Sequence, residues 1–120
     1  MKVFLDDKRD TPDGWVMVYW PAEAIGLLIT GNVEEISLDH DLGDADNALN
    51  EHRAEITGDD VIRWIAGKVI LEGFVPPTIY IHSDNASAKQ KMLIGIESIY
   101  RHWKANEVFA GIRRRMLDNT

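Results

Sequence analysis

Three short apolar runs that each end in ionisable residues constrain the fold of this chain more than any other feature. Burying several charged groups side by side costs several kcal/mol unless they are paired, so these residues are expected at an open edge. Parallel strands of an α/β sheet end along one edge, where ligands bind, so the pattern predicts one shared site there. The three junctions are Lys2–Leu5 before Asp6 and Asp7, Ile36–Leu38 before Asp39, His40 and Asp41, and Thr78–Ile81 before His82 and Ser83.

Apolar residues at helical spacing separate these runs and predict the connecting helices. Helices are expected over residues 21–30, from 57 or 59 to 72, and from 87 to 103, followed by a helical tail. The strand before Asp39 is expected over residues 35–38 and a further strand over residues 15–20, and residues 107–110 are the only weak candidate for a fifth. Strands that alternate with helices predict an α/β fold, here a small doubly wound domain with a mostly parallel sheet of four to five strands.

The composition narrows the class of protein. A chain of 120 residues, 45% hydrophobic and 28% charged, is expected to form one globular domain over 1–120, with a long loop over 43–57 and a helical tail over 105–120. The absence of cysteine excludes disulfides and cysteine zinc sites. No run approaches the roughly 20 apolar residues of a membrane span, and no signal-peptide pattern is present, so a cytoplasmic protein without a membrane partner is expected. A net charge of −7 argues against duplex nucleic acid as a partner.

The carboxylates that follow the first and third apolar runs are suited to a hard divalent cation. Asp6 and Asp7 are adjacent, and their charges repel each other unless a cation lies between them. Asp39 and Asp41 are two residues apart, so in an extended chain their side chains point the same way. One of them can then bind a metal while the other accepts a proton.

The residues at the three junctions resemble a known family. The motifs are Phe4-Leu5-Asp6-Asp7, Ser37-Leu38-Asp39-His40-Asp41-Leu42-Gly43, and His82-Ser83 followed by an asparagine. Together they are similar to receiver-like domains predicted to process cyclic phosphates, a divergent branch of the response-regulator receiver domains. The resemblance covers residue 3 to about residue 92 and implies a receiver or flavodoxin-like fold.

The resemblance implies hydrolysis more than phosphorelay, because the chain departs from signalling receivers in two ways. A signalling receiver has a lysine at the end of a fifth strand, and neither the strand nor the lysine is evident in this sequence. His40 and His82 are additional, and a plain phosphoacceptor pocket needs no histidine. The histidine pKa range suits His82 to proton transfer near neutral pH.

Each residue of the expected site can be given a role and, in some cases, an ordinary alternative. Ser83 is equally suited to capping the next helix, Lys8 and Arg9 to an ordinary surface pair, and His40 to packing. The expected roles are metal ligands for Mg²⁺ or Mn²⁺ at Asp6, Asp7 and Asp39, catalytic groups at His40, His82 and Asp41, and substrate-binding groups at Arg9, Lys8, Ser83 and Asn85.

The resemblance implies a metal-dependent phosphodiesterase that opens a cyclic nucleotide, a cyclic oligonucleotide messenger or a 2′,3′-cyclic phosphate end. The family association with phages implies an anti-defence role, in the host cytoplasm, if the setting is viral. Two alternatives remain open: a binding protein that sequesters the same ligand without cutting it, and a receiver-type switch phosphorylated on Asp39. A homodimer is compatible with the apolar and aromatic composition.

Overall fold

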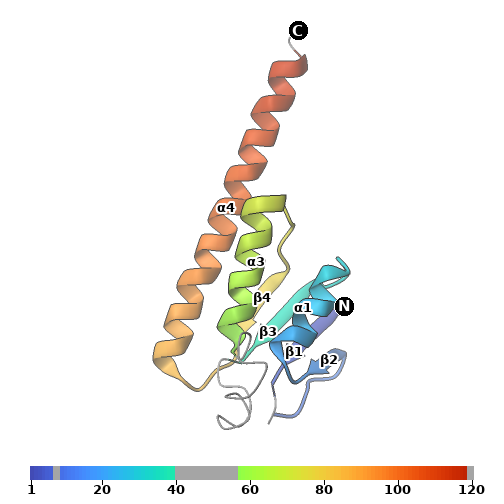
Figure 1. Cartoon of the computed structure of the whole chain (residues 1–120), viewed down its shortest axis with the longest axis vertical. Helices are drawn as coiled ribbons and strands as arrows, with labels where there is room; N and C mark the ends of the chain where they lie inside the picture. Colours follow the sequence, from blue (N-terminus) through green and yellow to red (C-terminus); the bar gives the residue numbers. More distant parts are fainter. Residues whose placement is uncertain (7–8, 40–56, 119–120) are drawn as a thin grey trace.

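The computed structural model describes residues 1–6, 9–39 and 57–118. In this part of the chain, four parallel strands form one sheet in the order β2-β1-β3-β4 (Figure 1). The α/β class, the all-parallel sheet of four strands and the receiver-like strand order confirm the predicted α/β fold with a mostly parallel sheet, although the described helices cover one face of the sheet and not both, as a doubly wound domain would have them. The elements are β1 (Lys2–Leu5), β2 (Trp15–Val18), α1 (Pro21–Ile29), β3 (Glu35–Leu38), α3 (Gly58–Glu72), β4 (Thr78–Ile81) and α4 (Ala86–Asp118).

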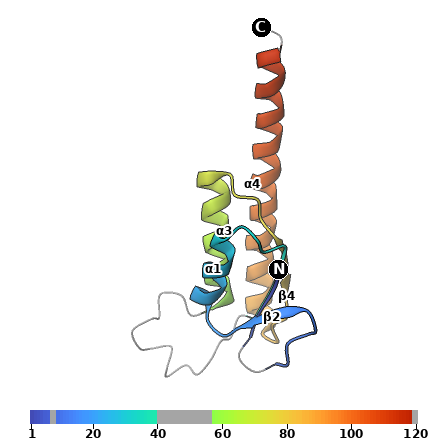
Figure 2. The same cartoon turned by 90° about the vertical axis from the view of Figure 1, so that its right-hand side faces the viewer.

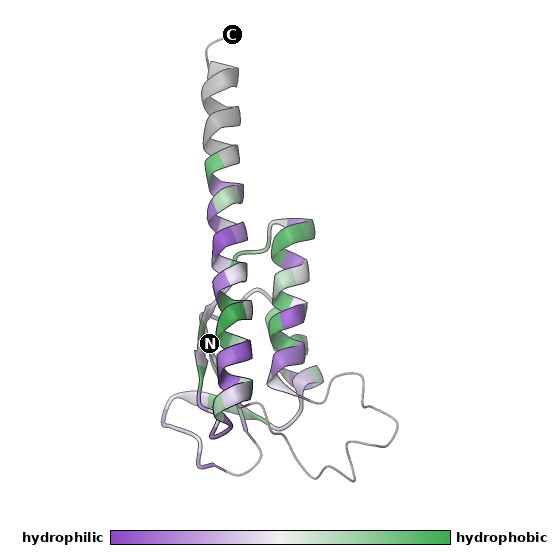
Figure 3. Ribbon diagram, turned by 90° about the vertical axis from the view of Figure 1, so that its left-hand side faces the viewer, coloured by the Kyte–Doolittle hydropathy of each residue, from purple (hydrophilic) through white to green (hydrophobic). Residues whose placement is uncertain are grey.

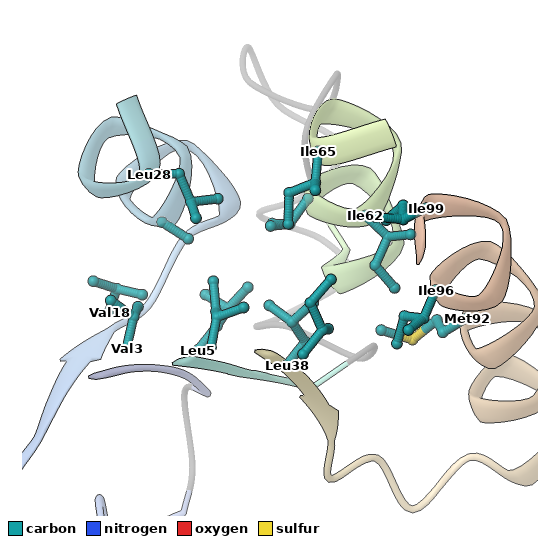
Figure 4. Close-up of a cluster of buried hydrophobic side chains, with 14 of the residues drawn as sticks. Val3, Leu5, Val18, Leu28, Leu38, Ile62, Ile65, Met92, Ile96 and Ile99 are labelled. Atoms are coloured by element: carbon teal, nitrogen blue, oxygen red, sulfur yellow. The ribbon is translucent and has the colours of Figure 1, made fainter. Parts of the chain in front are cut away.

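The hydrophobic core lies between the sheet and the three described helices, all of which lie against the same face (Figure 4). Side chains alternate between the two faces of a strand, so Val3 and Leu5 point at the helices and Phe4 points away. Leu38 on β3 faces Ile62 on α3 across this layer. Each fully buried aliphatic side chain contributes about 1.5–3 kcal/mol, so this layer is a main source of stability.

The opposite face of the sheet is closed by aromatic side chains, which we call the aromatic cover: Phe4, Trp15 and Tyr80. The Trp15 ring packs edge-on against Phe4 and against Tyr80, with 6.3 Å between ring centroids in both pairs. The Tyr80 hydroxyl donates to Glu35 at 2.9 Å. As a result Phe4 is only 7% exposed, although none of the described helices lies over it.

Local sequence signals account for the ends of α3. Thr57 precedes the helix in an extended conformation, and the Asp60 carboxylate accepts hydrogen bonds from its backbone nitrogen at 3.0 Å and from its hydroxyl at 3.2 Å. Gly73, with φ of +67°, ends the helix in the left-handed region that favours glycine. Along α3, polar and apolar residues alternate with the helical period (Figure 3).

One continuous helix, α4, replaces the separate helix and tail that the sequence predicts (Figure 2). The weak strand candidate at residues 107–110 is wrong, because these residues are part of this helix. No proline or glycine lies between Trp103 and Ala110, so nothing in this stretch stops the helix. Its second half extends beyond the end of α3, and the molecule measures 60 × 28 × 27 Å. No helix of the described residues combines the length and apolar character of a membrane span.

Candidate active site

Strand register brings three predicted site residues into one row at the carboxyl edge of the sheet. Leu5, Leu38 and Ile81 are register partners in β1, β3 and β4. The hydrogen bonds continue one residue further, because the backbone nitrogen of Asp39 donates to the Leu5 carbonyl at 3.1 Å and that of His82 donates to the Leu38 carbonyl at 3.0 Å. Asp6, Asp39 and His82 therefore occupy adjacent positions at the ends of neighbouring strands.

These three residues converge from segments far apart in the sequence. One ligand atom from each of Asp6, Asp39 and His82 lies within 4.8 Å of the other two. Asp6 is 1% exposed and its Oδ1 accepts a hydrogen bond from the backbone nitrogen of Arg9 at 3.2 Å. Burying a carboxylate this fully requires compensating partners, and the cluster supplies them.

His82 is held on three sides. Its Nε2 lies 3.0 Å from Oδ2 of Asp6, and its Nδ1 lies 2.7 Å from Oγ of Ser37. The imidazole stacks on Phe4, with 4.3 Å between centroids and 6° between planes. Burial lowers the pKa of His82, while the charges of Asp6 and Asp39 act in the opposite direction. The ring is thus fixed in position with its neutral form favoured.

Arg9 links the segments that follow β1 and β4. Its guanidinium donates to the carbonyl of His82, forms an ion pair with Asp84 at 2.6 Å, and lies 3.8 Å from Oδ2 of Asp6. Asp84 is 94% exposed, so this ion pair is screened by water and contributes little to stability. Arg9 can therefore exchange Asp84 for another anion at small cost.

Ser83 and Asn85 form the turn that leads into α4. The Ser83 hydroxyl accepts a hydrogen bond from the backbone nitrogen of Asn85 at 3.2 Å. The side-chain oxygen of Asn85 accepts from the backbone nitrogen of Ala88 at 3.1 Å, as a helix cap does. The structure thus gives both residues local roles at the start of α4, next to His82.

Gly58 allows α3 to begin directly against Asp39. A Cβ atom at this position would lie 2.1 Å from the carbonyl oxygen of Asp39, which is far inside van der Waals contact. Only glycine permits this approach. Gly58 therefore lets the start of α3 lie directly against the backbone of Asp39.

Four of the predicted site residues, Asp7, Lys8, His40 and Asp41, lie outside the described residues. Conversely, two residues that contribute to the site, Ser37 and Gly58, are absent from the sequence-based set. Ser37 has a signal that points to it, because it lies two positions before Asp39 and so shares a strand face with it. No sequence signal points to Gly58, since its role depends on how α3 meets the end of β3.

The donor set fits a hard divalent cation. Asp6 and Asp39 offer carboxylate oxygens, which Mg²⁺ and Mn²⁺ prefer, and the two side chains approach each other at the sheet edge. His82 offers a nitrogen ligand or, in its present contact, a hydrogen bond that orients the Asp6 carboxylate. Asp6 is buried and Asp39 is partly exposed, so a cation held by both carboxylates would lie at the edge of the site that solvent can reach.

Comparison with known proteins identifies the family. No curated protein and no solved structure gives a significant match to this chain. The sequence model of the cyclic-phosphate processing receiver domain matches residues 1–98, which include the whole sheet, α3 and the three converging residues. The chain therefore belongs to the family of cyclic-phosphate processing receiver domains.

Proposed function

We propose that this domain is a metal-dependent phosphodiesterase that opens a cyclic phosphate. The observation that carries the proposal is the convergence of Asp6, Asp39 and His82 at the carboxyl edge, within 4.8 Å of one another. Two carboxylates and an imidazole together offer a cation site and a titratable group, which phosphodiester hydrolysis requires. The family match to cyclic-phosphate processing receiver domains supports a cyclic phosphate as the substrate.

Asp6 and Asp39 are the residues we assign to Mg²⁺ or Mn²⁺, and the neighbouring Asp7 is proposed to complete the set. Bound there, the cation supplies positive charge to the phosphoryl oxygens and to the attacking water. The buried position of Asp6 and its contacts with Arg9 and His82 hold its carboxylate in a fixed orientation. Preorganised ligands of this kind lose little freedom when the site is filled.

Arg9 is the proposed phosphate-binding residue. A guanidinium pairs with phosphate through two parallel hydrogen bonds, and the exposed Asp84 that it now contacts is a weak competitor. Its contact with the His82 carbonyl would place a bound phosphate beside the imidazole. Lys8, Ser83 and Asn85 are proposed to add donors around the same phosphate.

His82 is the proposed proton-transfer residue. The proton is proposed to leave or arrive at Nε2, which lies beside the Asp6 carboxylate at the open edge, while Nδ1 is bonded to Ser37 within the sheet. Nε2 faces the carboxylates, where the cyclic ester would be opened. His40 and Asp41, adjacent to Asp39 in the sequence, are proposed as further acid–base groups.

The test is turnover of a substrate panel by the purified protein, with Mg²⁺ or Mn²⁺ and with EDTA. The panel contains cyclic mononucleotides, cyclic dinucleotides and oligonucleotides, and RNA ending in a 2′,3′-cyclic phosphate. We expect a ring-opened product that is not formed in the presence of EDTA or by the Asp39→Asn variant. The Glu97→Gln variant, which changes an exposed carboxylate on α4, should form the product as the wild type does. Tight binding without product would replace the proposal with sequestration, and labelling of Asp39 by acetyl phosphate would replace it with a phosphoacceptor switch.

A further inference from the structure

Ser37 is a buried hydroxyl in the centre of the sheet, where a β-branched or aromatic residue is the usual choice. It lies in β3 between Phe4 of β1 and Tyr80 of β4, and it is 7% exposed. A buried hydroxyl without a hydrogen bond destabilises a protein. The partner of this one is Nδ1 of His82, 2.7 Å from Oγ. The hydrogen bond to the His82 imidazole therefore explains why a serine occupies position 37, which apolar packing alone would not explain.

The hydrogen bonds at the two ring nitrogens determine which nitrogen carries the proton. Asp6 contacts Nε2 at 3.0 Å, and an ionised carboxylate accepts hydrogen bonds without donating any. The contact with Asp6 therefore favours the tautomer that carries its proton on Nε2. In the neutral ring Nδ1 is then an acceptor, and a hydroxyl is suited to donate to it.

Packing alone does not fix this arrangement. Phe4 stacks flat on the imidazole and sets the plane of the ring, but a flat contact does not distinguish the two flipped orientations. Rotation by half a turn about the Cβ–Cγ bond would replace both nitrogens with carbons at the positions that face Ser37 and Asp6. Hydrogen bonds at both nitrogens oppose this flip, and Ser37 provides one of them.

We infer that Ser37 is a positioning residue, whose hydroxyl keeps His82 in the Nε2–H tautomer with Nε2 directed at Asp6. The kinetic consequence of this inference rests on the proposed phosphodiesterase function. The structural part does not, because it concerns the ring in the protein without substrate. Without the Ser37 hydroxyl, we expect the His82 ring to populate both neutral tautomers and both flipped orientations.

The experiment compares three variants by nitrogen NMR of the histidine rings, at a mildly alkaline pH that keeps them neutral. Ser37→Ala removes the hydroxyl, Ser37→Thr retains it, and Ser98→Ala is the matched control. Ser98 forms the other serine–histidine contact of the described residues, with Nδ1 of His102 at 3.4 Å on the exposed surface of α4. The wild type is expected to give a protonated Nε2 and an unprotonated Nδ1 at His82. Ser37→Ala loses this pattern, Ser37→Thr regains it, and Ser98→Ala leaves it unchanged.

Kinetics provide the second measurement. Outer partners of site residues typically contribute 10–100-fold to activity, so Ser37→Ala is expected to lower kcat by about 10-fold with little change in KM. Persistence of the wild-type His82 signals in Ser37→Ala overturns the inference, and an unchanged kcat overturns its kinetic consequence. If the wild-type protein hydrolyses no cyclic phosphate, the proposed function fails, and the NMR comparison still decides the role of Ser37.

Discussion

Nε2 of His82 lies 3.0 Å from Oδ2 of Asp6, although 76 positions separate the two residues in the sequence. The contact results from the parallel register of β1, β3 and β4, which places the residue after each strand in the same row. A carboxylate and an imidazole held together at a sheet edge are suited to bind a cation and move a proton. The first predictions test this pair and its neighbours.

Asp39→Asn is expected to lower turnover by at least about 100-fold, because the proposed cation would contribute several kcal/mol and the variant removes one of its proposed charged ligands. Calorimetry with Mn²⁺ should record weaker binding in the same variant. Glu97→Gln removes an equal charge from an exposed position on α4 and should leave both measurements unchanged. Wild-type Mn²⁺ affinity in Asp39→Asn would exclude Asp39 as a ligand.

His82→Ala is expected to lower turnover by at least about 100-fold, a typical general acid–base contribution. His82→Gln separates proton transfer from orientation, since its amide can still donate to Asp6 but cannot exchange a proton at neutral pH. We expect the glutamine variant to match the alanine variant in kcat and the wild type in Mn²⁺ affinity. Recovery of kcat in His82→Gln would assign His82 to orientation of Asp6 alone.

Arg9→Lys is expected to raise KM by about 10-fold or more, because an ammonium does not form the paired hydrogen bonds of a guanidinium with phosphate. The matched control is Asp84→Asn, which frees Arg9 from its exposed partner and should lower KM slightly or leave it unchanged. Steady-state kinetics on the best substrate of the panel measures both. An unchanged KM in Arg9→Lys would show that Arg9 does not bind the phosphate of the substrate.

Two glycines of α3 are expected to respond in opposite ways to the same substitution. Gly58→Ala places a methyl group against the Asp39 carbonyl and should destabilise the domain by about 1–3 kcal/mol. Gly67→Ala meets no atom within 4 Å in the middle of the same helix and should stabilise it by about 0.5–1 kcal/mol. Urea unfolding of both variants checks the signs, and similar midpoints would contradict the close contact at Gly58.

Tyr100→Phe is expected to destabilise the domain by about 1–3 kcal/mol. The hydroxyl donates to the carbonyl of Pro77 at 2.6 Å and accepts from the backbone nitrogen of Ile79 at 3.2 Å, so the variant leaves both groups without this partner. Tyr80→Phe is the control, since its hydroxyl contacts Glu35 at the surface.

The effect of Tyr100→Phe should depend on pH. Burial raises the pKa of Tyr100 above its ordinary value of 10.0. Because the folded state holds the proton more tightly, the contribution of Tyr100 to stability is complete below pH 10 and is lost as the pH rises through the raised pKa. The difference in unfolding free energy between wild type and variant should therefore shrink at strongly alkaline pH. A constant difference would contradict the burial of this hydroxyl.

The sequence predicts the sheet well because its strands are short apolar runs with clear ends. The bounds of β3 and β4 agree with the prediction, and the parallel arrangement follows from the helices between strands. The common edge of Asp6, Asp39 and His82 follows from the same reasoning. β2 ends at Val18, two residues before the predicted end, because Trp20 already caps α1.

Other features depend on contacts between distant residues, which periodicity does not reveal. The strand pattern places Ser37 on the same face as Asp39, but its partner at His82 lies 45 positions away. The fit of Gly58 against Asp39 depends on the angle at which α3 meets the sheet. The sequence predicts a helix over residues 87–103 and a separate helical tail, and the structure joins them into one helix, α4.

The aromatic cover has a consequence for how the imidazole is held. The ring of Trp15, at the amino end of β2, packs against Phe4, and Phe4 lies flat beneath the ring of His82. Trp15, at the amino end of β2, therefore supports the packing that holds the His82 ring at the carboxyl edge of the sheet. Replacing Trp15 by a smaller ring would change the packing beneath the His82 imidazole without altering an ionisable group.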